Sequence, residues 1–273
     1  MIISTDRKLI VGLEIGTTKV ITLVGEIIKD GTIKIIGMGI CKSKGIDKGK
    51  INNLDEVIEC IKKSIHKAEI TADCHITSVY LSLSSKHIKC QNEIGIVPIS
   101  EDEVTQDDIN NVIHTAKSVQ MFHKNKMLHI IPQEYSIDKQ SGIKNPIGLS
   151  GIRMQVKVHI ITCHQNTSKN IVKALEKCDL KANKIIFSGL ASSKSVITDD
   201  ERKLGACVID IGGGTIDLTI YLNDYIQDSQ VIPYAGNIVT SDIAHAFSIS
   251  YHDAEDLKIK YGAAIKLSPD MLK

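Results

Sequence analysis

The sequence predicts an α/β fold with two lobes and an inserted smaller module, and three observations support this prediction. The chain of 273 residues is too long for one ordinary compact core and too short for three large ones. Segments of strand-like alternation are interleaved with segments whose apolar residues recur at helical spacing. A strand, turn, strand unit near the start is echoed around residues 208–215. Two lobes of this kind leave room for a cleft.

The first lobe is predicted to open with an antiparallel meander. Strands are expected over residues 9–15, 20–28 and 33–41, with Asp30-Gly31 as the turn between the last two. A helix capped by Asn53 should follow and cover the sheet, because apolar residues recur on one face. These residues are Leu54, Val57, Ile58, Ile61, Ile65 and Ala68. A further strand is expected over 76–84.

A smaller unit that mixes strands with a helix is predicted between residues 85 and 164. One or two strands are expected over 87–99, and Ser100 with Glu103 has the spacing of a capping box. The helix that follows should bury Ile109, Val112, Ile113, Ala116 and Val119. Alternation over 152–160 predicts a strand whose buried face carries Ile152, Met154, Val156, Val158 and Ile160, with His159 on the wet face.

After this module the chain is predicted to return to the larger lobe. Thr167 is expected to start a helix, and a short strand should follow over 184–187. The inner face of that helix carries Ile171, Val172, Leu175 and Cys178. The predicted division is residues 1–84 plus 165–200 for the first lobe, 85–164 for the module and 201–273 for the second lobe.

Composition excludes several classes of protein. Lys and Arg number 33 against 32 Asp and Glu, so no excess of positive charge indicates a nucleic-acid partner. The seven cysteines are odd in number and never spaced C-x-x-C, which argues against a disulfide framework or zinc site and favours a reducing cytosol. No stretch reaches the roughly 18 apolar residues of a membrane-spanning helix, and no secretory signal is expected.

Two distant segments have the same pattern. In each, an apolar strand ends in an acid followed by an isoleucine, a turn of small residues comes next, and a second apolar strand runs back. The first contains Glu14, Gly16, Thr17, Thr18 and Lys19, and the second contains Asp210, Gly212, Gly213, Gly214 and Thr215.

Such turns suit phosphate binding. Glycine and threonine let backbone N–H groups and hydroxyls approach phosphate oxygens closely, so two facing turns would clamp a polyphosphate. An acid before each turn suits magnesium, which takes one or two carboxylates together with phosphates and water. Lys19 would add a positive charge. A single glycine-rich hairpin is often only a turn, but its duplication with matching flanks favours a binding site.

These residues resemble a known family. The hexad 210–215 resembles the second phosphate loop of actin-like and DnaK-type ATPases. Further segments are similar to the FtsA family of bacterial division proteins, and the resemblance covers essentially the whole chain. They are residues 12–17, 91–95, 131–135, 142–146, 148–151 and 233–237.

The resemblance implies actin-like, ribonuclease H-like lobes that bind ATP and magnesium. Residues 16–19 would form the first phosphate loop and residues 210–215 the second, with Glu14 and Asp210 near the metal. Glu14 stands where the superfamily usually has Asp, which implies a contact through water or at altered distance. Residues 189–195 contain no Gln or Glu to orient an attacking water, so no catalytic base is assigned and at most weak ATPase activity is expected.

The resemblance also implies a role. Such a scaffold would form filaments, help to assemble and tether the FtsZ ring at the cytoplasmic face of the bacterial inner membrane, and recruit later division proteins through the module. On the family layout the second lobe is incomplete, without the adenosine-contacting element and the terminal membrane helix, and most of the FtsZ-docking surface lies in the missing part. Two alternatives stay open: a sugar kinase or chaperone-like ATPase, and a pilus-assembly relative.

Other polar features are interpreted as structural. His159 and His164 are not spaced to share a metal on one strand, and Cys207 is expected to pack rather than react. An acidic cluster is expected to stabilise a helix N-terminus; its members are Glu101, Asp102, Glu103, Asp107 and Asp108. Three tyrosines are expected in the sheet or at its edge: Tyr221, Tyr225 and Tyr234.

Overall fold

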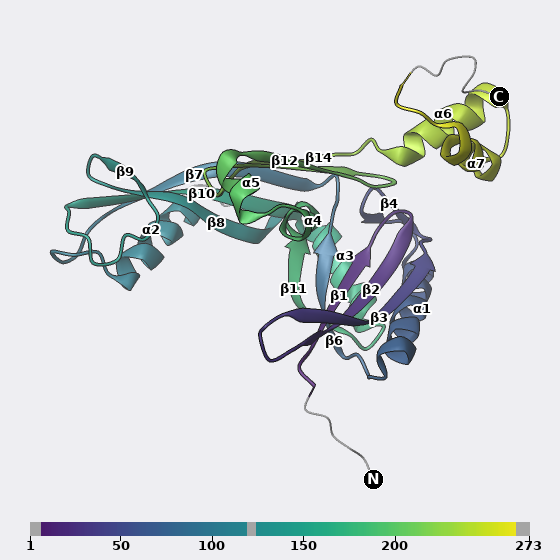
Figure 1. Ribbon diagram of the computed structural model, residues 1–273, viewed down its shortest axis with the longest axis horizontal. Coiled ribbons are helices and arrows are strands. Elements are labelled where there is room, and N and C mark those ends of the chain that lie inside the picture. Colours follow the sequence, from purple (N-terminus) through teal and green to yellow (C-terminus); the bar gives the residue numbers. More distant parts are fainter. Residues whose placement is uncertain (1–6, 119–123, 266–273) are drawn as a thin grey trace, which may run out of the picture.

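The computed structural model describes residues 7–118 and 124–265 and arranges them around three larger sheets, with a small two-stranded sheet beside them (Figure 1). A five-stranded sheet forms the first lobe, a four-stranded sheet extends away from it as the module, and a three-stranded sheet begins the second lobe. The strands of the second lobe run beside those of the module, while the last two helices lie apart at the other end.

The first-lobe sheet has the strand order β11-β6-β1-β2-β3. The predicted meander is confirmed, since β1, β2 and β3 pair antiparallel, whereas β6 pairs parallel with both β1 and β11. The bounds are β1 Leu9–Ile15, β2 Lys19–Ile27, β3 Ile33–Lys42, β6 Ser78–Leu83 and β11 Lys181–Phe187.

Helix α1 (Leu54–Ala72) covers one face of this sheet (Figure 1). Asn53 caps it as predicted, its side chain accepting from the N–H groups of Asp55 and Glu56. The helix approaches β3 so closely that a Cβ on Gly39 would lie 1.8 Å from the Ser64 carbonyl oxygen, so this contact requires glycine. Buried residues of the core include Leu13, Val20, Val24, Val57, Ile61, Leu81, Leu175 and Phe187.

The module is an antiparallel sheet with the order β7-β10-β8-β9 and its own core beneath α2. The bounds are β7 Ile88–Pro98, α2 Gln106–Ser118, β8 Asn125–Ile137, β9 Gln140–Ile143 and β10 Arg153–His164. Residues predicted to be buried here include Val112, Ala116, Met154, Val156 and Val158, and all five are buried. Val119 lies outside the described residues.

The predicted capping box at Ser100 is wrong. Val104 is buried, and its N–H donates to the Leu149 carbonyl, so the chain stays extended and α2 starts only at Gln106. Thr105 caps it instead: its hydroxyl and N–H bond to Asp108, whose own N–H returns a bond to Thr105. These bonds hold the pKa of the buried Asp108 below its usual value. Asp108 is therefore not one of the solvated acids of the predicted cluster.

Two further predictions for the module and its exit are corrected. Ile152 precedes β10 and is 82% exposed, while His159, expected on the wet face, is completely buried because β14 covers it. The helix predicted from Thr167 is α3 (Gln165–Glu176), which starts two residues earlier because His164 caps it. The Nδ1 atom of His164 accepts from the Asn166 N–H.

The second lobe begins with a three-stranded antiparallel sheet. Short helices α4 (Ser188–Val196) and α5 (Asp199–Leu204) lead into it, and its strands are β12 Ala206–Ile211, β13 Ile216–Leu222 and β14 Tyr225–Ile232. Helices α6 (Gly236–Phe247) and α7 (Tyr251–Tyr261) follow. Cys207, expected to pack, is exposed, because it lies on the sheet face that no described element covers. Tyr234 lies after β14 rather than in the sheet.

A buried polar seam joins the module to β14. His159 Nδ1 lies 2.8 Å from Asn92 Oδ1, and its Nε2 lies 2.7 Å from Ser229 Oγ. Asn92 donates to the Gln227 carbonyl, and Gln133 donates to the Ile226 carbonyl. The module is therefore attached to the second lobe as well as to the first.

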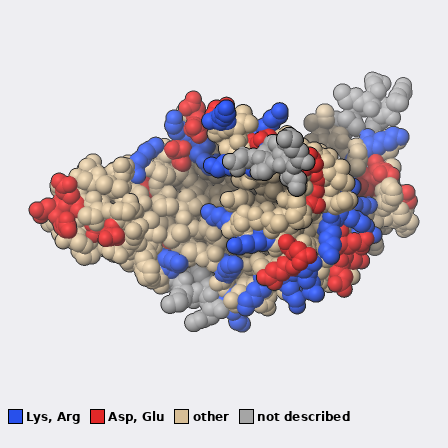
Figure 2. Space-filling view, turned by 90° about the horizontal axis from the view of Figure 1, so that it is seen from below, with Lys and Arg blue, Asp and Glu red and all other residues tan. Residues whose placement is uncertain are grey.

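The surface shows no field of one sign on the face drawn in Figure 2. Basic and acidic side chains are interspersed there, and a group of acidic residues stands at the far end of the module. None of the helices within the described ranges is long and apolar enough to span a bilayer.

Candidate functional site

The two predicted turns have the same backbone geometry. The Gly16 N–H donates to the Lys19 carbonyl at 3.0 Å, and the Gly212 N–H donates to the Thr215 carbonyl at 2.9 Å. Each turn joins two antiparallel strands, β1 to β2 and β12 to β13. The internal echo seen in the sequence is thus a structural repeat, with Glu14 and Asp210 each one residue before its strand ends.

The two turns face each other across a very short gap. A Cβ on Gly213 would lie 2.1 Å from Thr18 Oγ1, and one on Gly214 would lie 2.5 Å from Thr17 Oγ1. Neither glycine has a positive φ angle. The sequence therefore needs glycine here for the close approach of the lobes rather than for an unusual backbone conformation.

Helix α6 supports the second turn from behind. The N–H of Gly236 donates to the Gly212 carbonyl at 3.1 Å, and that of Asn237 donates to the Gly213 carbonyl at 2.8 Å. These bonds satisfy N–H groups that a helix N-terminus otherwise leaves without partners, and α6 has no side-chain cap. Helix α6 therefore holds the second turn through the backbone carbonyl oxygens of that turn.

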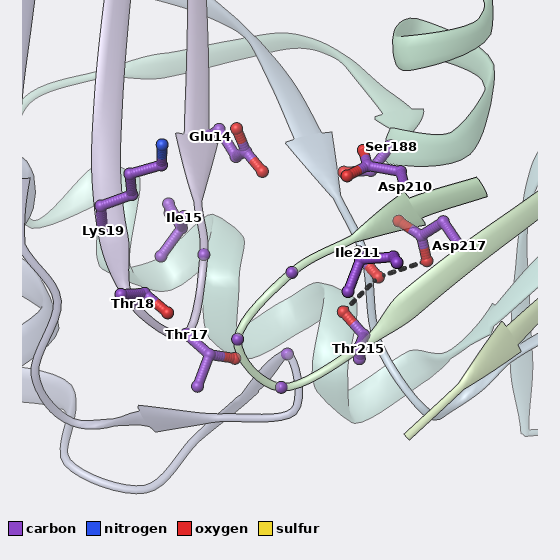
Figure 3. A pocket seen from close by; sticks show the side chains of 16 residues that line it. Glu14, Ile15, Thr17, Thr18, Lys19, Ser188, Asp210, Ile211, Thr215 and Asp217 are labelled. Carbon is purple, nitrogen blue, oxygen red and sulfur yellow. Dashed lines mark hydrogen bonds between the residues drawn. The ribbon is translucent and has the colours of Figure 1, made fainter. Parts of the chain in front are cut away.

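All ten predicted site residues line one cavity of about 280 Å³. Figure 3 shows Glu14 and Asp210 pointing into the same gap from opposite sides, one from the first lobe and one from the second. Thr17 and Thr18 lie at the lower end of the cavity beside the second turn. The predicted convergence of the two acids on one cavity is therefore present. The residues are Glu14, Gly16, Thr17, Thr18, Lys19, Asp210, Gly212, Gly213, Gly214 and Thr215.

The acids of this cavity interact electrostatically. Desolvation, and then the charge of Asp210, raises the pKa of Glu14, while Lys19 acts in the opposite direction. Burial raises the pKa of Asp217 to about 7, a shift that the Ser84 hydrogen bond opposes and that Asp210 and Glu14 add to. A cation in the cavity would relieve this repulsion.

The carboxylates are not arranged as a direct metal cage. Within residues 7–118 and 124–265, no group of three or more His, Cys, Asp or Glu side chains is placed to hold one metal ion. Magnesium usually keeps several waters and takes only one or two carboxylates. The donor set therefore fits a hydrated ion that also contacts phosphate, and it fits a closed protein site poorly.

Four polar residues at the site were not predicted from the sequence. Asp217 and Ser84 line the cavity together with Ser188, and Ser192 of α4 donates a hydrogen bond of 2.5 Å to Asp210 Oδ2. A signal for Asp217 was present, because it is an acid in a strand that is otherwise largely apolar. Ser84 directly follows a parallel strand, where ligand sites of α/β sheets often lie. The serines of α4 carried no comparable signal.

Two family models match the chain. Residues 85–162 match the model described as "SHS2 domain inserted in FTSA", and residues 207–271 match "Cell division protein FtsA". The first covers the module and the second covers most of the described second lobe.

Named relatives align with nearly the whole chain. It is 74% identical over 273 residues to the cell division protein FtsA of Buchnera aphidicola subsp. Schizaphis graminum, with all of this chain and 65% of that protein covered. It is 61% identical over 265 residues to the FtsA of Escherichia coli K12, covering 97% of this chain and 63% of that protein. The chain thus spans slightly less than two thirds of the length of these relatives.

Solved structures share the fold. A chain of the PilM-PilN type IV pilus biogenesis complex matches with a TM-score of 0.68 at 16% identity, covering 93% of this chain and 70% of that one. The ethanolamine utilization protein EutJ of Carboxydothermus hydrogenoformans matches with a TM-score of 0.54 at 10% identity, covering 93% and 62%. At these identities the likeness concerns the fold alone. The predicted actin-like α/β architecture with an inserted module is confirmed.

Proposed function

Because the chain belongs to the FtsA family of cell division proteins, we propose that it is an ATP-binding, actin-like scaffold of cell division. The observation that carries the nucleotide part is the convergence of two equivalent turns, with Glu14 and Asp210, on one cavity. The chain spans 65% and 63% of two relatives, so the activity and partners of the whole protein are part of this proposal.

The residues fit a magnesium-bound triphosphate. The cavity is lined at the two turns by backbone and small side chains, and a Cβ on Gly213 or Gly214 would collide with the Thr18 or Thr17 hydroxyl of the facing turn. In the proposed complex, the N–H groups and hydroxyls of the two turns bind phosphate oxygens, and Lys19 contributes a positive charge. Glu14 and Asp210 would hold a magnesium ion, which would neutralise phosphate charge.

Ser192 has a supporting role in this proposal. Its hydroxyl donates to Asp210 Oδ2, which fixes the direction of the carboxylate that faces the metal. Residues that support metal ligands in this way often matter nearly as much as the ligands. Ser192 is thus a positioning residue.

Hydrolysis is proposed to be slow. The lining of the cavity contains Ser188 where α4 begins and no glutamine, and its only glutamate is Glu14. A glutamate that contacts the metal through water is poorly placed to act as the base that orients an attacking water. ATP would then act mainly by favouring one arrangement of the lobes.

The proposed cellular role is to help assemble and tether the FtsZ ring at the inner membrane, to self-associate into filaments, and to recruit later division proteins through the module. Family membership supports this role. A sugar kinase or chaperone-like ATPase is disfavoured, because both matching family models and the named relatives are FtsA proteins. A pilus-assembly role would rest only on a likeness of fold at 16% identity.

Nucleotide binding is tested by equilibrium titration of the purified chain with ATP, with and without magnesium. We expect binding that requires magnesium and that weakens by about tenfold or more, at least ~1.4 kcal/mol, in Glu14→Gln and Asp210→Asn. Asp102→Asn, an exposed acid of the module, is the matched control. Magnesium-dependent binding that survives both substitutions would contradict the assigned site.

The scaffold role is tested by sedimentation with and without ATP and FtsZ. We expect ATP-dependent pelleting of the chain, alone or with FtsZ polymers. The opposite result, rapid turnover of ATP on a small acceptor with no sedimentation, would favour the phosphotransferase alternative.

A further inference from the structure

A short hairpin of the first lobe borders the phosphate cavity. It consists of β4 (Ile46–Asp47) and β5 (Lys50–Ile51), joined through Lys48 and Gly49. Ile46 is buried in the first-lobe core, which anchors the base of the hairpin. Gly49 lines the cavity, so the tip of the hairpin forms part of its wall.

The tip is wedged between the two lobes. On one side, a Cβ on Gly49 would lie 1.9 Å from the Ser84 carbonyl oxygen, and the Lys86 N–H donates to the Lys48 carbonyl. On the other side, the backbone nitrogen of Lys48 lies 3.1 Å from the Cβ position of Gly214 in the second phosphate turn. Lys48 has a φ angle of 48°, a left-handed conformation that is costly for a lysine. Gly49 has a φ angle of 71°, and a two-residue hairpin turn of this kind requires a positive φ at both of its central residues.

The side chain of Lys48 makes a second contact with the other lobe. Its Nζ lies 5.0 Å from the ring centroid of Tyr234, within the range of a cation–π interaction. Tyr234 is 62% exposed, so burial in the core does not explain the position of its ring. It lies two residues before Gly236, whose N–H holds the Gly212 carbonyl of the second turn. Lys48 thus contacts the second turn directly and also contacts the segment that supports it.

We propose that Lys48 and Tyr234 form a latch that holds the two lobes closed over the phosphate cavity and slows release of the nucleotide. This inference rests on the proposed binding of ATP. Lys48 acts as a positioning residue: its ammonium bridges to the second lobe while the backbone around it completes the cavity wall. A latch of this kind raises affinity by increasing the fraction of molecules in the closed arrangement.

The latch is tested by the rate at which a fluorescent ATP analogue dissociates from the magnesium complex in stopped flow. Lys48→Met removes the charge and keeps a side chain of similar length. Methionine meets the same cost as lysine in the left-handed backbone conformation, so the backbone contribution is unchanged. We expect the analogue to dissociate about two- to fivefold faster from this variant, a ratio that corresponds to the free energy of an exposed cation–π contact. Tyr234→Leu should do the same, whereas Lys48→Arg and Tyr234→Phe should release the analogue at nearly the wild-type rate.

The combined variant separates a latch from two independent effects. If Lys48 and Tyr234 act through each other, Lys48→Met with Tyr234→Leu should be no faster than either single variant. The matched control is Lys144→Met, which removes an ammonium 5.8 Å from the Tyr225 ring in a contact outside the cavity. It should leave the rate unchanged.

Hydrogen exchange of the nucleotide-free chain provides a readout that needs no ligand. In Lys48→Met, residues 46–51 and 233–237 should exchange faster than in the wild type. If the wild type binds nucleotide but neither dissociation nor exchange changes in this variant, the latch is wrong. If the wild type binds no nucleotide, the proposed function is wrong, and the exchange result alone decides whether Lys48 holds the lobes together.

Discussion

The Ser84 hydroxyl donates a hydrogen bond of 2.6 Å to Oδ1 of Asp217 and so joins the end of β6 in the first lobe to β13 in the second. Ser84 Oγ also lies 2.9 Å from Thr215 Oγ1 in the second turn. Figure 3 shows both contacts as dashed lines at the wall of the cavity. One hydroxyl thus links the two lobes directly beside the proposed phosphate site.

Replacing Ser84 by alanine should lower the free energy of unfolding. Asp217 is 4% exposed, and it would lose the hydrogen bond that opposes the rise of its pKa. Removing one partner of such a buried pair costs about 1 to 3 kcal/mol. Urea denaturation would measure it, with Ser195→Ala as the control, since Ser195 is exposed and bonds only within α4. Equal stability of both variants would show that the link between the lobes contributes nothing.

Asp217 should make stability fall as pH rises. Its folded pKa is about 7 against an ordinary value of 3.8, so between these values the native state binds more protons than the unfolded state. The stabilisation is complete below pH 3.8 and is lost as pH rises through 7. In Asp217→Asn this loss should disappear, so that the variant gains stability relative to the wild type from pH 4 to pH 7.

Wild type and Asp217→Asn must be compared, because two histidines change the pH dependence of stability in the opposite direction. Burial lowers the pKa of both His129 and His159 to about 4, and their stabilisation is lost as pH falls below the ordinary 6.5. The wild-type profile is the sum of these effects, and only the difference between wild type and Asp217→Asn isolates the carboxyl. If the difference in free energy of unfolding between wild type and Asp217→Asn does not change from pH 4 to pH 8, the raised pKa of Asp217 is wrong.

The cavity could be predicted from the sequence because its signal is local. Each turn is encoded within about ten consecutive residues by an acid, small residues and flanking apolar strands, and the two copies reinforce each other. The first-lobe meander and α1 were predicted for the same reason, since alternation, the Asp30-Gly31 turn and the Asn53 cap depend on near neighbours.

The misses arise from contacts between segments distant in sequence. The alternation of the strand places His159 on the face opposite the core, which would be exposed to solvent if β14 did not pack on it. No local sequence pattern indicates this contact. Ser100 has a good capping spacing, but pairing of the Val104 segment with residues 148–149 keeps the chain extended. Asp217, Ser84 and Ser192 become site residues only when the two lobes meet. Tertiary packing overrides local preference in each case.

The buried seam between the module and β14 should depend on His159. Asn92 Oδ1 accepts from Gln133 Nε2 and lies 2.8 Å from His159 Nδ1, so Nδ1 carries a proton and Nε2 accepts from the Ser229 hydroxyl. A neutral ring satisfies both partners. His159→Ala would remove the bonds from the ring to Asn92 Oδ1 and to the Ser229 hydroxyl and open a cavity, and should lower the free energy of unfolding by about 2 to 4 kcal/mol.

Chemical denaturation at two pH values tests this role. The stability difference between wild type and His159→Ala should shrink as pH falls from 6.5 to about 4, because the buried ring must then accept an unfavourable charge. His66→Ala, at an exposed position of α1, is the control and should change stability little. A loss of stability that is independent of pH would mean that His159 matters only for packing.

The close approach of the two turns should make Gly213 intolerant of any side chain. A Cβ there would lie 2.1 Å from Thr18 Oγ1 and 3.0 Å from Asn237 Oδ1, and the β-branched Thr18 has few rotamers with which to withdraw. Gly213→Ala should therefore push the lobes apart and weaken ATP binding by about tenfold or more, at least ~1.4 kcal/mol. Gly12→Ala is the matched control, because a Cβ at Gly12 meets nothing within 4 Å.

Equilibrium titration of Gly213→Ala with either threonine or alanine at position 18 distinguishes a clash from a general disturbance of the turn. Thr18→Ala removes the hydroxyl, so adding Gly213→Ala to that variant should weaken ATP binding far less than adding it to the wild type. An equal loss in both backgrounds would mean that the two turns do not meet at this point in solution.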